Sequence, residues 1–107
     1  MDVNAEASFD LANTSDKMTL RIGRPYFDQA DQNWCCTFEL SRPLEVSRTI
    51  YGEYSFQALL LALKTASAYL YGSKLYRDGQ IGIFGQFGGY LNMPAPKEFM
   101  DVAPYPF

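Results

Sequence analysis

Length, composition and charge limit this chain to one globular domain. Its 107 residues are 48% hydrophobic and 20% charged, which suffices for one two-layer core and is too apolar for a disordered chain. The net charge of -3, with nine basic residues scattered singly, argues against nucleic-acid binding, because that function needs a concentrated positive patch.

Four segments in the first half alternate apolar and polar residues with the period of two that predicts β-strands. They are residues 5–11, 18–22, 34–40 and 44–50. The stretch RPYFDQADQN is predicted to be a loop or a wide hairpin end, because Pro25 cannot donate to a β-ladder. Arg48 interrupts the apolar face of the fourth segment, so we expect it near the end of the sheet or paired with an acid. The connections are short, which favours antiparallel neighbours.

Residues 50–76 predict one long helix, which begins at Gly52 or Ser55 and ends at Gly72 or Gly79. One apolar stripe has spacings of three and four and is predicted to cover the sheet: Phe56, Leu59, Leu60, Leu63, Ala66 and Leu70. A second stripe consists of small residues around one leucine: Tyr54, Ala58, Leu61, Thr65, Ala68 and Gly72. A helix that is apolar on two sides needs a second cover.

The C-terminal arm, roughly residues 80–107, is rich in glycine, proline and aromatic residues. QIGIF predicts a further strand, and the rest of the arm is expected to cover the helix, unless a partner or a second copy does so. The predicted fold is a single α+β domain over residues 1–107. It has an antiparallel sheet of four to five strands, one long helix packed on one face and the aromatic arm.

The sequence offers little chemistry. It contains no histidine, so the commonest general base and metal ligand is missing, and we expect neither an enzyme nor a metal or cofactor site. The adjacent Cys35 and Cys36 are expected to be reduced and structural, with a vicinal disulfide or redox switch as the alternative. The Gly82, Gly85 and Gly88 spacing lacks the lysine and the following helix of a phosphate loop.

The cellular location of the protein is predicted from two features that its sequence lacks, a signal peptide and a membrane span. The first ten residues have neither the positive start nor the apolar core of a signal peptide. Lys64 and Gly72 interrupt the apolar helix, so we expect no membrane span and a cytoplasmic protein.

The strand WCCTFEL followed by IYGEYSFQALLLAL resembles a family of small uncharacterised bacterial proteins over roughly residues 20–94. The matching positions are Trp34, Cys36, Phe38, Leu40, Tyr51, Gly52, Ser55, Gln57, Ala58 and Leu59. The family pattern has an aspartate before the serine, whereas this chain has Tyr54, which weakens the expected helix cap. Gln57 is expected to hydrogen-bond either the sheet edge or the strand-to-helix turn.

By size and chemistry alone, small acidic domains of this kind resemble immunity proteins, which neutralise a toxin by binding it. We therefore expect a non-catalytic protein-binding domain whose partner is another protein, such as a toxin. The candidate partner-binding residues are Tyr26, Asp28, Asp31 and Glu53.

Two alternatives come from other classes of function. One is a structural subunit that forms a homodimer through Ala58, Leu61 and Ala68. The other is a small-molecule carrier with a pocket between the sheet and the C-terminal arm.

Overall fold

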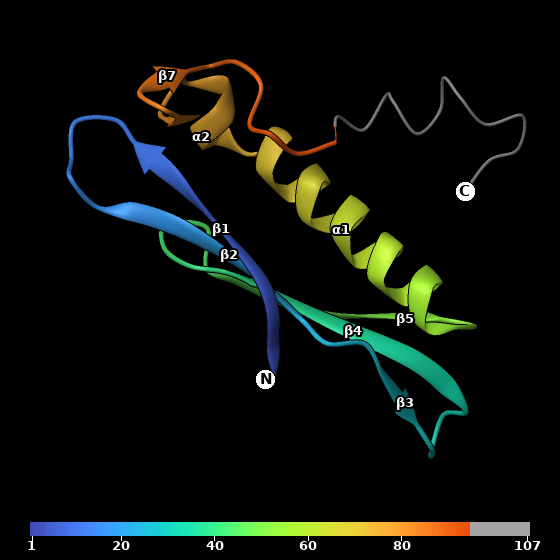
Figure 1. Cartoon of the computed structure of the whole chain (residues 1–107). Helices are drawn as coiled ribbons and strands as arrows, with labels where there is room; N and C mark the ends of the chain where they lie inside the picture. The colour runs from blue at the N-terminus through green and yellow to red at the C-terminus, as the bar shows by residue number, and fades with distance from the viewer. Residues whose placement is uncertain (95–107) are drawn as a thin grey trace, which may run out of the picture.

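The computed structural model describes residues 1–94 in two layers, an antiparallel sheet and one long helix on one of its faces (Figure 1). The strands are β1 (Val3–Leu11), β2 (Lys17–Gly23), β3 (Tyr26–Asp28), β4 (Asn33–Leu40), β5 (Val46–Gly52), β6 (Ile81–Ile83) and β7 (Gln86–Phe87). The helices are α1 (Ser55–Tyr71) and the short α2 (Lys74–Arg77). The predicted α+β class with one long helix is confirmed.

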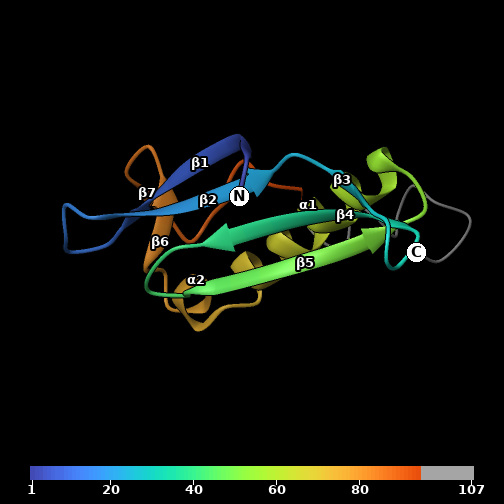
Figure 2. The ribbon, with the colours of Figure 1, turned by 90° about the horizontal axis from the view of Figure 1, so that it is seen from below.

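The sheet is arranged around β4, which has neighbours on both sides. β5 pairs along one side of β4, and β2 and β3 lie end to end along the other, followed by β1, β6 and β7 (Figure 2). The prediction of four to five strands is too low, because the described residues form seven. The stretch that contains β3 was predicted to be a loop or a wide hairpin end, and it forms the end of a hairpin in which pairing with β4 begins directly after Pro25. β7 has only two residues, too few for a visible alternation.

The core lies between α1 and the apolar face of the sheet. Ala58, Ala62, Ala66 and Leu70 of α1 are fully buried against it. The predicted sheet-facing stripe is wrong at Phe56, which is 68% exposed. The physical reason is size, because alanines bring the helix axis close to the sheet and larger side chains then fit only along the flanks.

The ends of α1 show how the chain turns from β5 into the helix. Tyr54 is the N-cap residue and makes no side-chain capping bond, as its replacement of an aspartate predicted. The Gln57 side chain instead accepts a hydrogen bond from the Glu53 backbone N–H, which confirms the expected link to the strand-to-helix turn. Gly72 is the C-cap residue.

Tyr71 fixes the described part of the C-terminal arm to α1. Its hydroxyl group accepts a hydrogen bond from the Leu91 N–H at 3.1 Å and donates its O–H to the Met93 carbonyl at 2.9 Å. Leu91 and Met93 are buried, and burial raises the pKa of the Tyr71 phenol. This part of the arm packs on its own domain, as expected, and residues 95–107 lie outside the described part of the chain.

Ser67 provides a test of the core. It is fully buried on α1, and its hydroxyl has no hydrogen-bond partner among residues 1–94. A buried unpaired hydroxyl is destabilising, and alanine is the better helix former. Ser67→Ala is therefore expected to raise the free energy of unfolding by about 1 kcal/mol in urea titrations.

Ser73→Ala is the matched control, because the Ser73 hydroxyl donates to the Leu70 carbonyl and accepts the Tyr76 N–H. This control should lower stability by about 1 kcal/mol. A loss of stability in Ser67→Ala comparable to that of the control would contradict the unpaired state of Ser67.

Candidate functional site

Five large aromatic side chains are exposed on β3, the end of β5 and the start of α1. These three segments lie toward the same end of the molecule (Figures 1 and 2). We call this group the aromatic end: Tyr26, Phe27, Tyr51, Tyr54 and Phe56. Isolated exposed aromatics are ordinary on protein surfaces, but several gathered at one place are typical of an interaction surface.

The strand register brings the aromatic end together. Tyr26 of β3 and Tyr51 of β5 are both paired with Cys35 of β4, so the two tyrosines flank it on the sheet face away from α1. Phe27 lies on the opposite face and makes an edge-to-face contact with Trp34, with ring centroids 5.8 Å apart. The aromatic end therefore presents side chains on both faces of the sheet.

The four predicted partner-binding residues lie at this same end, but they do not play equal parts. Tyr26, Asp31 and Glu53 are exposed. Asp28 is half-buried, and its carboxylate accepts the Ala30 N–H at 2.9 Å and the Asp31 N–H at 3.3 Å. Asp28 therefore shapes the turn between β3 and β4, which leaves Asp31 and Glu53 as an acidic rim beside the aromatics.

Sequence reasoning missed four of the five aromatic residues: Phe27, Tyr51, Tyr54 and Phe56. Phe27 was assigned to a loop or a wide hairpin end, Tyr51 was noted only in the family resemblance, and Tyr54 and Phe56 were assigned to apolar stripes of the helix. The available signal for Tyr54 and Phe56 was position, because Tyr54 is the N-cap residue of α1 and Phe56 lies in its first turn, close to the end of β5.

The cysteines are inert in this structure. Both are free and fully buried, in agreement with the expectation of reduced structural thiols. Burial raises the pKa of the Cys35 thiol, and the negative charge of Asp28 raises it further. A thiol with a raised pKa stays protonated at neutral pH and is a poor nucleophile.

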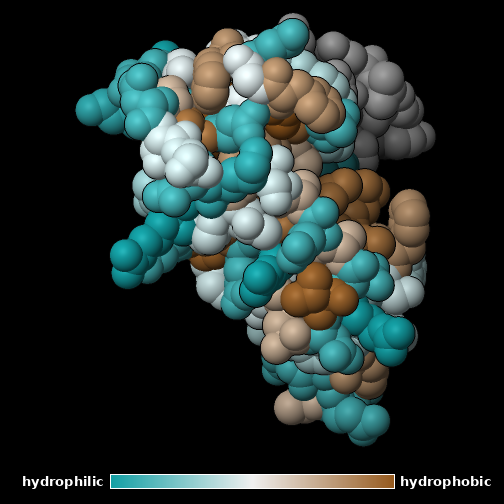
Figure 3. Space-filling view, turned by 60° about the vertical axis from the view of Figure 1, so that its left-hand side comes forward, coloured by the Kyte–Doolittle hydropathy of each residue, from teal (hydrophilic) through white to brown (hydrophobic). Residues whose placement is uncertain are grey.

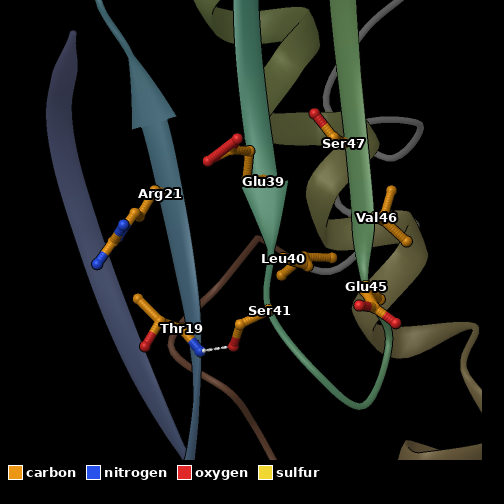
Figure 4. A pocket seen from close by; sticks show the side chains of 8 residues that line it. All are labelled: Thr19, Arg21, Glu39, Leu40, Ser41, Glu45, Val46 and Ser47. Carbon is orange, nitrogen blue, oxygen red and sulfur yellow. Dashed lines mark hydrogen bonds between the residues drawn. The ribbon is translucent and has the colours of Figure 1, made fainter. Parts of the chain in front are cut away.

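A shallow pocket of about 390 Å³ lies on the sheet face away from α1, close to the turn between β4 and β5 (Figure 4). Several of the polar groups that line it are already engaged in hydrogen bonds or ion pairs within the domain. Arg21 donates to the Glu6 carboxylate at 3.1 Å, and the Ser41 hydroxyl accepts the Thr19 N–H at 2.8 Å. Glu39 points toward the strand that carries Arg21. Among the residues that line this pocket, we find no nucleophilic side chain that is hydrogen-bonded to a general base.

The space between the sheet and the C-terminal arm is the place expected for a carried small molecule. An apolar cavity of about 170 Å³ lies there, lined by Ala5, Glu6, Ala7, Leu20, Ile22, Leu63 and Met93. Apolar side chains gather in the middle of this side of the molecule, with polar ones around them (Figure 3). Ligand pockets usually have about 300–1,000 Å³, so this cavity is too small for a typical one.

The residues predicted for self-association do not share one surface. Ala58 is fully buried against the sheet, whereas Leu61 is half-buried and Ala68 is exposed. Ala58 is unable to contact a second copy of the folded chain.

Two further properties of residues 1–94 concern metals and membranes. No three cysteine or carboxylate side chains lie close enough together there to hold a metal ion. None of the helices in this range has the length and apolar character needed to cross a membrane.

A second group of exposed aromatics, Phe84, Phe87 and Tyr90, lies around the β6–β7 hairpin at the opposite end of the molecule (Figure 1). Phe84 is 89% exposed and has a backbone φ of 52°, a left-handed conformation that phenylalanine rarely adopts. The next residue, Gly85, also has a positive φ and donates its N–H to the Asp10 carboxylate at 2.8 Å. Asp10 is also paired with Lys17, whose bond lowers the pKa of that carboxyl group.

The hairpin conformation predicts that Phe84 costs stability. Asn tolerates the left-handed region far better than Phe, so Phe84→Asn is expected to raise the free energy of unfolding by about 1 kcal/mol. Phe84→Ala keeps the unfavourable backbone and should give no such gain. Thermal and urea unfolding of the two variants measure this, and equal stabilities would contradict the assignment of strain to φ.

These features define the class of protein: a two-layer α+β domain with one helix on an antiparallel sheet and an exposed aromatic end. Within that class the chain belongs to the family called domain of unknown function DUF6968, whose model matches residues 5–95. The expected membership of a family of small uncharacterised domains is thereby confirmed. No characterised protein and no solved structure matches the chain.

Proposed function

We propose that this chain is a non-catalytic protein-binding domain, and that the aromatic end is its docking surface. The observation that carries the proposal is that five exposed aromatic side chains lie toward one end of the molecule, on β3, the end of β5 and the start of α1. Aromatic residues dominate binding hot spots, because they bury a large area at a small cost in side-chain entropy.

The acidic rim supports a basic partner. Asp31 and Glu53 are exposed, and neither belongs to an ion pair within residues 1–94. Carboxylates at the edge of an apolar contact speed the approach of a positively charged surface and disfavour acidic competitors. The overall charge of -3 acts in the same direction.

In the specific form that we propose, the domain is a bacterial, cytoplasmic, immunity-type inhibitor. It neutralises a toxin or effector by covering the partner's functional surface. The support is a small acidic domain with exposed aromatic side chains at one end and no histidine for acid–base chemistry.

The test is co-purification of the full-length tagged chain from its native host, with each associated protein identified by mass spectrometry. Phe56→Ser is expected to weaken the binding of a stoichiometric, basic partner by at least about tenfold, because it removes the most exposed side chain of the aromatic end. Phe84→Ser is the matched control, since it removes an exposed phenylalanine from the other end and should leave binding unchanged.

Charge reversal tests the acidic rim separately. Asp31→Lys and Glu53→Lys should slow association with that partner, whereas Asp16→Lys, an exposed acid outside the aromatic end, should not. In the immunity form, the partner alone is toxic to cells, the wild-type chain restores growth and Phe56→Ser does not. A partner that is held equally by the Phe56 and Phe84 variants would refute the aromatic end as the docking surface.

A further inference from the structure

The outer edge of β5 is a long free edge of the sheet. β5 pairs with β4 at every residue from Val46 to Gly52 without a bulge, and within residues 1–94 no strand pairs with its other side. Free edges of this length and regularity are rare in isolated domains, because they accept strands from other chains.

The hydrogen-bond pattern shows which backbone groups point outward. The N–H of Ser41, which directly follows β4, bonds to the Thr19 carbonyl of β2, so the odd-numbered residues of β4 face β2. Its even-numbered residues therefore face β5, where they meet Arg48 and Ile50. The N–H and C=O groups of the alternate residues point away from the sheet: Ser47, Thr49 and Tyr51.

We propose that this edge pairs with the β5 edge of a second copy of the chain, in an antiparallel register centred on Thr49. That register uses the whole strand and places Ser47 opposite Tyr51 of the second copy, so that all outward backbone groups find partners. It also places Arg48, the only charged residue of β5, opposite Ile50 of the second copy. A register centred on Arg48 would bring the guanidinium groups of the two copies together. Charge repulsion therefore favours the register centred on Thr49.

Arg48 is held in a position that suits this pairing. Contrary to the sequence prediction, it lies in the middle of β5 and has no acidic partner among residues 1–94. Its guanidinium instead donates to the Tyr69 hydroxyl at 2.7 Å. This bond directs the charge toward α1 rather than across the free edge.

The position of α1 gives the same dimer a second contact. α1 packs mainly on β4 and β5, so it lies above the space between these two strands. Neighbouring strands are about 4.8 Å apart, so each helix would lie about one strand spacing from the twofold axis of the dimer. The two helices would then be about 10 Å apart. Helices pack at about 8–10 Å when their facing side chains are small. The flank of α1 on the β5 side, which Tyr69 marks, carries the half-buried Leu61 and Thr65 and the exposed Ala68.

The second copy thus covers part of the small-residue stripe of the helix. It does so without Ala58, which is buried in the core. This inference is independent of the proposed function. A failure of the dimer would leave the aromatic end as it is, because Tyr51 alone belongs to both surfaces.

The experiment is sedimentation equilibrium of the full-length chain over a range of concentrations, with two matched proline variants. Ser47→Pro removes an outward N–H of β5 without touching the β4 ladder, and it should weaken dimerisation by at least about tenfold, because the twofold loses two hydrogen bonds. Ser8→Pro is the control. Ser8 is an exposed serine of β1, and its N–H points away from β2, on the same side as the N–H of Ala12, which directly follows β1 and bonds to the Gln80 carbonyl.

Two further measurements keep the inference testable if proline disturbs folding. Ala68→Glu places like charges at the helix contact of the dimer and should also give a monomer, with the circular dichroism unchanged. In wild type at dimeric concentrations, the amides of Ser47, Thr49 and Tyr51 should exchange with solvent more than about tenfold slower than those of Glu6 and Ser8. A monomer at every concentration would overturn the inference, as would a dimer weakened equally by both prolines.

Discussion

The close approach of Gly52 to the first turn of α1 is the constraint on which the rest of this structure depends. A β-carbon on Gly52 would lie 2.6 Å from the backbone nitrogen of Ala58 and 3.0 Å from its Cα atom, which is closer than real contacts allow. Only glycine lets the end of β5 meet the helix backbone directly. The contact fixes where α1 begins, and Ala62 and Ala66 then continue the close packing along the sheet.

The same constraint accounts for the exposed aromatics. Because α1 begins directly against the end of β5, Tyr54 and Phe56 lie at the rim of the interface rather than within it. β3 extends the sheet past Trp34 on the other side and adds its own two aromatics. The fold therefore holds these side chains on strand and helix ends, which suits a preformed binding surface.

The alternation of apolar residues predicted much of this fold, because a half-buried sheet and its period of two leave a direct trace in sequence. It located β1, β2, β4, β5 and β6, and the glycines located the end of the helix. The helix's buried face was mispredicted because hydrophobicity ranks Phe56 above Ala58, whereas the space above the sheet admits only the smaller residue.

The candidate site was predictable only in part, for a related reason. Tyr26, Asp31 and Glu53 were recognised as surface residues because they lie in polar surroundings. Phe56 was not, because an exposed aromatic and a buried one look the same in sequence. The local role of Asp28 depends on backbone N–H groups that only the folded turn brings to it.

The central claim is that the aromatic end is kept for binding and adds little to stability. Its most direct test is the free energy of unfolding of the double variant Tyr54→Ser and Phe56→Ser, measured by urea titration of the full-length chain. The account predicts a value within about 0.5 kcal/mol of wild type, as for exposed residues that make no structural contact. A loss of about 3 kcal/mol or more, typical of a core aromatic, would show that these side chains hold the fold together and would contradict the account.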